Sequence, residues 1–314
     1  AMLRSLIGRR FWIVSYAMMA AGFWLPGDYP WLRPMIPIAL GGILFFTGLR
    51  VRLGDVGAQL RGSRSQVQLS ILVMVKLIAL PVVAYAITWL IAPQWALGVM
   101  LVSMMPGGLS SVAFADLYGG NLGLALIVVL LTSLLCSLTI PLLLQTFDPG
   151  GGIDWHAIVP QAWYVLALLA TPFGLAQLTR WLATDYVVRH HVRWGYCAIA
   201  CSSILVFVSI APNRGAWRDF AAADLLAPLL LASLICALTV AMAVFARNIM
   251  READATAFAC NCIYMNNGLA VSFVVKFYPD NAHMLLPSVL MQIPMLGATA
   301  LFGWWARRGR GVSL

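Results

Sequence analysis

The sequence predicts an all-α membrane protein with ten transmembrane helices, and three observations support this fold class. The 314 residues are 62% hydrophobic and only 10% charged, with a mean hydropathy of +0.88. Soluble domains, by comparison, are about 45–50% apolar and about 25% charged. The apolar residues also form long stretches, and the arginines gather at one side of the predicted membrane. A polytopic helical membrane protein accounts for all three observations.

Ten stretches approach the roughly 20 apolar residues that a helix needs to cross the hydrocarbon core. The first is the least regular, because Pro26 and Gly27 interrupt it. Arg4, Arg9 and Arg10 lead directly into it and no small-residue cleavage site follows, so we expect no cleavable signal peptide. The predicted spans lie near residues 11–25, 34–53, 66–92, 95–117, 121–146, 157–182, 193–211, 224–246, 255–278 and 283–306.

The distribution of basic residues predicts the topology. With the N-terminus placed in the cytoplasm, fifteen arginines fall on the cytoplasmic side and four basic residues on the opposite side. This positive-inside bias favours an even number of spans with both termini in the cytoplasm. We therefore expect a multi-pass protein of a bacterial-type inner membrane. The net charge of +9 is a topology signal, and nucleic acid is not an expected partner.

Two of the spans are interrupted at their centres by small and polar residues. The fourth reads Met-Pro-Gly-Gly-Leu-Ser-Ser at 105–111, and the ninth reads Met-Asn-Asn-Gly-Leu at 265–269. Unwound backbone at membrane depth must be buried in protein or line a wet cavity, because lipid cannot satisfy its polar groups. A single break is equally well explained by a proline kink or by close glycine packing. Two matched breaks favour the substrate site of a secondary transporter.

The positions of the breaks predict an internal repeat. Ten spans divide into five and five, and an odd-numbered half enters the membrane in the opposite sense from its partner. We therefore expect two inverted five-helix repeats, at 1–148 and 149–314, with the breaks at corresponding positions. The Gly-rich connection near 148–156 is the expected hinge between them.

Lys76 is the other unusual feature, because it lies near the centre of the third span. A charge there costs at least a few kcal/mol, so an intramembrane ionisable residue usually has a function. The alternatives are a side chain that reaches the interface and a structural bond to carbonyls exposed at a broken helix. A buried lysine can also gain and lose a proton during transport.

No catalytic or metal-binding pattern is readable in the sequence. The four histidines fall in loops or at span ends, and the six cysteines fall in apolar spans, where they are typical packing residues. Nucleotide-binding motifs and paired carboxylates do not occur. We therefore expect neither an enzyme nor a primary pump, and no cofactor.

Two local motifs indicate a family. Pro106–Val112 is similar to Pro-Gly-Gly-Thr-Ala-Ser-Asn, and Asn266–Ala270 is similar to the end of Glu-x-Gly-Met-Gln-Asn-Ser-Gly-Leu-Ala. On these residues, and in its span count, the chain resembles the bile acid:sodium symporter family, with its apical sodium-dependent bile acid transporter-like fold. The resemblance implies a core domain (spans 3–5 and 8–10), a panel domain (spans 1, 2, 6 and 7) and discontinuous helices 4 and 9 that cross. It also implies an organic anion between the domains and two sodium ions behind the crossing.

Most sodium ligands that the resemblance implies are missing. The family's Asn, Glu and Gln at the two breaks fall on Val112, Asn261 and Met265, and its third-span Gln falls on Lys76. A hard cation needs several oxygen ligands and usually a carboxylate. Two like charges 4 Å apart also repel by about 4 kcal/mol at an effective dielectric constant of 20. Sodium is therefore a doubtful cofactor.

We expect the Lys76 ammonium to take the role of a sodium ion. The remaining members of the predicted ion-coupling or sodium-substituting set are residues with oxygen-bearing side chains. They are Ser111, Thr132, Ser133 and Asn261. Transport would then be independent of sodium.

The predicted substrate site uses the half-helix N-termini, because their N–H groups and dipoles favour an anion. Its residues are Gly108, Leu109, Ser110, Asn266, Asn267, Gly268 and Gln292. The predicted function is alternating-access transport of a small or amphipathic organic anion by a protein whose partners are that anion and the lipid bilayer. The alternatives are a sodium-coupled, bile acid-like symporter, an uncoupled auxin-carrier-like facilitator and a non-transporting receptor. Nothing in the sequence requires more than a monomer.

Overall fold

The computed structural model describes residues 2–25, 29–51, 63–108, 110–148, 154–213, 220, 222–279 and 281–308. Within these ranges the regular structure is helical, apart from one isolated β-bridge. The α-helices are α1 (Met2–Trp24), α2 (Met35–Gly48), α4 (Ser63–Met74), α5 (Leu80–Ile91), α6 (Ala96–Ser103), α7 (Ser110–Leu117), α8 (Leu122–Phe147), α9 (Trp155–Leu182), α10 (Thr184–Arg189), α11 (His191–Ile210), α12 (Ala222–Ile249), α13 (Glu252–Ile263), α14 (Asn267–Phe277), α15 (Ala282–Leu290) and α16 (Gln292–Arg308). Residues 149–153 of the expected hinge lie outside the described ranges.

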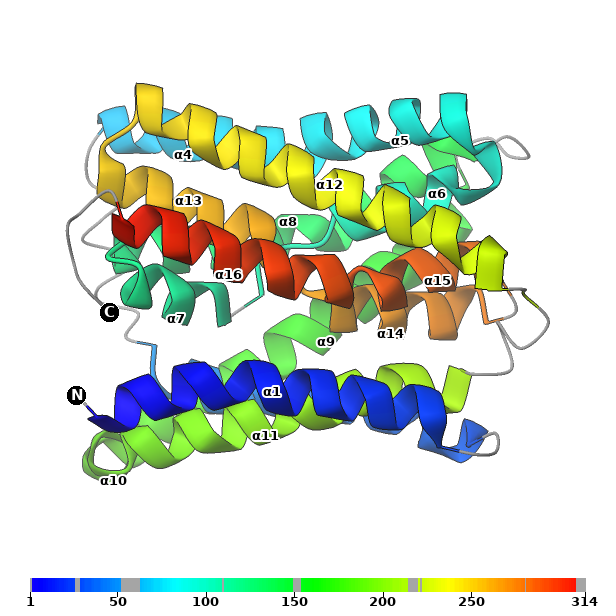
Figure 1. The fold of residues 1–314 in the computed structure, drawn as a ribbon. Coiled ribbons are helices and arrows are strands. Elements are labelled where there is room, and N and C mark those ends of the chain that lie inside the picture. The colour runs from blue at the N-terminus through cyan, green and yellow to red at the C-terminus, as the bar shows by residue number, and fades with distance from the viewer. Residues whose placement is uncertain are drawn as a thin grey trace.

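The helices form two groups that lie one over the other. We call α1, α2, α9 and α11 the panel group: α11 packs on both α1 and α2, and α9 packs on α2 and to a similar extent on α8. The core group consists of α4 to α8 and α12 to α16. In Figure 1 the panel helices α1 and α11 lie below the core helices, and the start of α1 and the end of α16 lie at the same end of the bundle.

Seven helical segments of the described chain are long and apolar enough to cross a membrane. They lie at Pro30–Gly48, Leu69–Ile91, Leu122–Phe147, Trp155–Leu182, His191–Asn213, Asp224–Ile249 and Ala282–Ala306. The other three predicted spans are α1 and the two broken spans, α6 with α7 and α13 with α14. Each broken span consists of two helices of 8 to 12 residues, which are individually too short to count as spans. The chain is a multi-pass membrane protein, and the ten-span inverted repeat stays a prediction.

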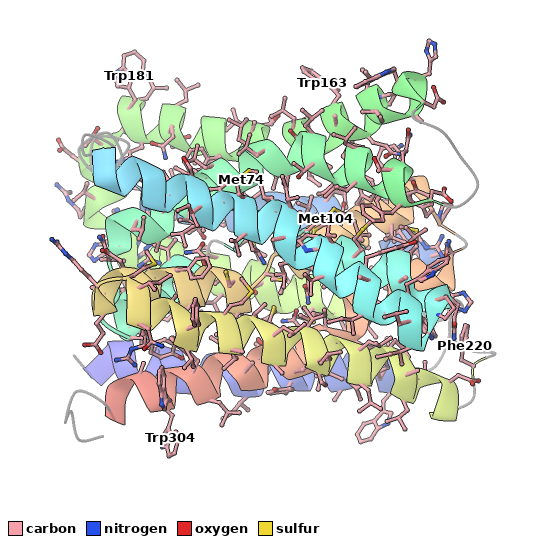
Figure 2. The ribbon with its side chains drawn as sticks, turned by 90° about the horizontal axis from the view of Figure 1, so that it is seen from above. Met74, Met104, Trp163, Trp181, Phe220 and Trp304 are labelled. Carbon is pink, nitrogen blue, oxygen red and sulfur yellow. The ribbon has the colours of Figure 1, made fainter. Side chains whose placement is uncertain are left out.

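The outer surface carries large apolar side chains. Trp163, Trp181 and Trp304 point away from the bundle in Figure 2 and are 69%, 76% and 44% exposed. Met104, which directly follows α6, is fully buried. Exposed tryptophans are expected where a helical bundle meets lipid and the membrane interface.

The third span is not a continuous α-helix. A five-residue π-helix, Val75–Ala79, joins α4 to α5, and Pro81 lies at the start of α5. Proline lacks an N–H group and its ring crowds the preceding turn, so the regular α-helical bond cannot form there. One residue before the proline, the Leu80 N–H donates to the Val75 carbonyl, five residues back, as in a π-helix. Lys76 lies within this π-helix, an irregularity that often accompanies functional sites.

Candidate functional site

The two broken spans cross and pair through their backbones. Gly107 and Met265 form an antiparallel bridge between the breaks. On each side, the N–H that follows one bridge residue donates to the carbonyl that precedes the other. These hydrogen bonds are Gly108 to Tyr264 and Asn266 to Pro106, each 2.9 Å long. The pairing satisfies unwound backbone that lipid would leave unpaired.

Gly107 is required at the crossing because of close approach. A Cβ atom at this position would overlap Oδ1 of Asn261, which comes from α13. The backbone therefore lies directly against an amide side chain of the other broken span. A kink alone would not require this contact, so the pattern of small residues at the break has a packing reason.

Asn261 is buried behind the crossing and uses both of its N–H donors and one acceptor position of its oxygen. Its Oδ1 accepts from the Ser111 hydroxyl at 3.1 Å. Its Nδ2 donates to the carbonyls of Ala257 at 2.9 Å and Ala125 at 3.3 Å. The amide thus ties α7, α8 and α13 together, and its two N–H groups point at backbone oxygens.

Lys76 is buried behind the same crossing, with 1% of its surface exposed. Its Nζ donates to the Cys262 carbonyl at 3.5 Å, in the last turn of α13. Helix C-termini leave carbonyls unpaired and carry a partial negative charge, so an ammonium is favourable there. Among the described residues, no ion pair joins this ammonium to a carboxylate.

The other two predicted members of this set lie apart from each other. The Thr132 hydroxyl is buried and donates to the Val128 carbonyl of its own helix at 2.6 Å. Ser133 lines a separate, mostly apolar cavity of about 150 Å³ between α2, α8 and α9. The structure therefore brings Ser111 to Asn261 but directs Ser133 elsewhere, because adjacent helical residues point in different directions.

A cavity of about 60 Å³ lies in front of the crossing, between the panel and core groups. Five of the predicted substrate residues line it, and no acidic or basic side chain is among the described residues of its wall. These five are Ser110, Asn266, Asn267, Gly268 and Gln292. Leu109 lies outside the described residues.

Two of the backbone donors predicted for the substrate already have partners. The Gly108 N–H donates to Tyr264, and the Asn267 N–H donates to the Met265 carbonyl at 3.1 Å. Both are used by the crossing itself, so neither is a free donor in this structure. The asparagine side chains have local roles as well. Oδ1 of Asn266 caps α14 by accepting from the Leu269 N–H at 3.3 Å, while Nδ2 of Asn267 donates to Oε1 of Gln292 at 3.5 Å.

Several cavity residues were not predicted from the sequence. Ser202 and Ser209 reach the cavity from α11, Ser288 reaches it from α15, and Tyr264 reaches it from the ninth-span break. Ser202 and Ser209 are two helical turns apart and therefore share a face. That spacing is a readable signal for a polar stripe on the panel group. The remaining wall is apolar and comes mainly from α2 and α11.

Comparison with known proteins gives a family match. Residues 37–216 match the sodium bile acid symporter family. A curated relative, the uncharacterized sodium-dependent transporter YocS of Bacillus subtilis (strain 168), is 29% identical over 166 residues. The aligned region covers 52% of this chain and 49% of YocS, so the match spans about half the length of that relative.

Proposed function

The chain belongs to the sodium bile acid symporter family, and on this premise we propose that it is a secondary transporter of a small or amphipathic organic anion. The observation that carries this proposal is the paired crossing of two broken spans beside a cavity between two helix groups. Discontinuous helices that meet at a cavity are the usual binding arrangement of such transporters. Relative movement of the panel and core groups would open the cavity to each side in turn.

The helix termini support an anionic substrate. α7 begins at Ser110 and α14 begins at Asn267, and both residues line the cavity. Each helix start carries roughly half a positive charge, which favours a carboxylate or sulfate. Membership of a transporter family likewise favours transport over catalysis.

We further propose that transport does not require sodium, because the residues behind the crossing do not fit the ion. Asn261 directs its amide N–H groups, rather than free oxygens, into the space between α8 and α13. The Lys76 ammonium already occupies the carbonyl end of α13. Sodium requires oxygen ligands, and a fixed ammonium would repel it. Lys76 would thus hold the crossed helices in place of the ion.

Sodium-coupled symport is the second candidate. The family description includes sodium, and the relative YocS is named a sodium-dependent transporter. An uncoupled, facilitator-like carrier and a proton-coupled carrier both remain within the sodium-independent proposal. We also propose the two-repeat, ten-span topology with both termini in a bacterial-type cytoplasm, which the basic-residue bias supports.

Uptake into proteoliposomes tests the proposal. The purified full-length chain would be given labelled cholate and a panel of small carboxylates, in sodium buffer and in choline buffer of equal ionic strength. We expect carrier-dependent uptake of at least one anion, at equal rates in both buffers. Uptake that strictly requires sodium would overturn the sodium-independent proposal, and no uptake of any anion would overturn the transport proposal.

The variant Lys76→Gln separates the proton-coupled form from the uncoupled form. If Lys76 exchanges a proton during the cycle, the variant loses the pH dependence of uptake. Unchanged uptake with unchanged pH dependence would exclude the proton role. Thr146→Val, which removes a hydroxyl from the exposed end of α8, is the control for effects of substitution on insertion and folding.

A further inference from the structure

A second cavity lies beside the cavity in front of the crossing. We call the cavity in front of the crossing the front cavity, and the cavity of about 150 Å³ between α2, α8 and α9 the side cavity. The described wall of the side cavity is apolar apart from Ser133. An apolar cavity of roughly 150 Å³ stays free of water and can bind a group of the size of benzene, with about six carbon atoms. The side cavity therefore suits an apolar group of that size.

The two cavities meet at one residue of α2. Among the described residues of their walls, only Leu44 borders both. It is 5% exposed and belongs to the main apolar core of the bundle. Leu40, one helical turn earlier, borders the front cavity but not the side cavity. The two spaces are therefore continuous apart from the thickness of a leucine.

The side cavity cannot hold a charged group. Its described wall contains no acidic or basic side chain. Its wall residues in α8 and α9, at 129–134 and 166–173, belong to the middle turns of those helices, whose N–H groups bond within the helix. An anion buried without donors is strongly unfavourable. Only the apolar part of an amphipathic anion can therefore enter the side cavity.

The front cavity is too small for the whole of such an anion. Its volume of about 60 Å³ accommodates a few ordered waters. A small charged group fits there, but an apolar group of about six carbons does not fit beside it. Such a group needs an adjoining apolar space, and the side cavity adjoins at Leu44.

We propose that the side cavity receives the apolar chain of the transported anion, and that Leu44 determines how readily this chain enters. The proposal rests on the proposed transport function and narrows its substrate class to anions with one charged group and an apolar chain. The charged group lies in the front cavity, and the chain passes Leu44 into the space between α8 and α9.

A membrane acyl chain is the competing occupant. Leu134 of α8 lines the side cavity and is 56% exposed, so this wall reaches the outer surface of the bundle. The connection to the front cavity at Leu44 favours the transported anion instead. The two occupants differ in what they predict when the side cavity is filled by a larger side chain.

Uptake of two labelled alkylsulfonates by the full-length chain in proteoliposomes tests the proposal. Ethanesulfonate and hexanesulfonate carry the same charge and stay ionised, so neither crosses the bilayer as a neutral acid. Protein-free liposomes give the background. Each methylene removed from water favours binding by about fourfold. We expect hexanesulfonate to have a half-saturating concentration at least about tenfold lower than that of ethanesulfonate.

Filling the side cavity assigns this preference to it. Ala170 lines the side cavity from α9. Ala170→Phe is expected to raise the half-saturating concentration of hexanesulfonate until the two probes are nearly equal. The matched control is Thr171→Phe, because Thr171 is exposed on the same helix and lies outside the walls described for both cavities. It is expected to leave the ratio of the two probes unchanged.

Shortening the shared residue tests its own role. Leu44→Ala is expected to lower the half-saturating concentration of hexanesulfonate at least about threefold relative to that of ethanesulfonate, because the chain no longer has to displace the leucine. Leu40→Ala is the control, since it also removes a buried leucine from α2 but borders only the front cavity. It is expected to change both probes by the same factor.

The outcomes separate this inference from the proposed function. Equal half-saturating concentrations for the two sulfonates in the unmodified protein would overturn the assignment of the side cavity. A ratio that survives Ala170→Phe would overturn it as well and would leave the side cavity to a membrane acyl chain. Equal effects of Leu44→Ala and Leu40→Ala would overturn the role of Leu44. Failure to move any anion, small carboxylates included, would overturn the transport function itself.

Discussion

The two faces of the helix crossing differ in how their polar groups are satisfied. Behind the crossing, Asn261 and Lys76 donate to backbone carbonyls of the protein itself. In front of it, Ser110, Asn266 and Asn267 line a cavity whose described wall carries no acidic or basic side chain. The polar groups behind the crossing bond to the protein itself, whereas those in front of it border a cavity. We therefore expect substitutions behind the crossing to change stability and substitutions in front of it to change anion uptake.

Restoring the family's sodium ligands behind the crossing is expected to have the largest effect, because it would remove the difference between the two faces. The combined variant Lys76→Gln, Val112→Asn, Asn261→Glu and Met265→Gln is expected to be stabilised by sodium. A ligand that binds only the folded state at one hundred times its dissociation constant adds about 2.7 kcal/mol. Thermal unfolding in sodium and in choline buffers measures this gain. A sodium-specific shift of the unmodified protein would instead show that its rear face binds the ion.

Adding a side-chain atom at the crossing would disturb both faces together. Gly107→Ala places a methyl group against Asn261, and overpacking of this kind costs about 1–3 kcal/mol. We expect a lower melting temperature and loss of uptake. Gly174→Ala is the control, because a Cβ there meets no atom within 4 Å. Equal melting temperatures and equal uptake for the two variants would argue against a tight crossing.

Adjacent serines allow the two faces to be compared directly. Ser111 donates to Asn261 behind the crossing, whereas Ser110 lines the cavity. Ser111→Ala is expected to lower stability by about 1 kcal/mol and to leave the relative affinities for anions unchanged. Ser110→Ala is expected to weaken anion uptake with a smaller effect on unfolding. Calorimetry and uptake on both variants would check this, and the reverse assignment would refute it.

The smallest expected effect concerns the contact between the panel and core groups. The Tyr164 hydroxyl of α9 and the Ser272 hydroxyl of α14 are 2.7 Å apart. Removing this hydrogen bond with Tyr164→Phe is expected to shift the balance between transport conformations by about 0.5–1 kcal/mol. Accessibility of an introduced cysteine in the cavity, with and without substrate, measures the shift. No change in accessibility would show that this contact is not part of the moving interface.

The sequence was sufficient to predict that the two breaks belong together, because the chemistry of unwound backbone in lipid is local. It also singled out Lys76 from the residues themselves, whereas the exchanged ligand positions came from the resemblance to the family. The family membership that these motifs indicated is confirmed. The roles of the individual site residues stay predictions.

Other features depend on contacts that the sequence does not reveal. The π-helix at Val75–Ala79 lies beside a proline, and from it Lys76 reaches the end of α13. Ser202 and Ser209 became cavity residues only because α11 packs against α14. The sequence predicted the Gly108 N–H as an anion donor, but in the structure it donates to Tyr264 in the bridge to the other break. Each of these depends on which distant helix lies alongside.

The contact between Lys76 and Cys262 has a consequence for the direction of transport. If Lys76 replaces sodium as proposed and keeps its proton throughout the cycle, its positive charge returns with the chain and draws no energy from an ion gradient. Moving one charge across a membrane potential of 100 mV changes its free energy by about 2.3 kcal/mol. This corresponds to a ratio of about fifty between the anion concentrations on the two sides. In a cell that is negative inside, an uncoupled carrier of a monoanion would therefore drive it outward. We expect such a protein to work as an exporter or exchanger.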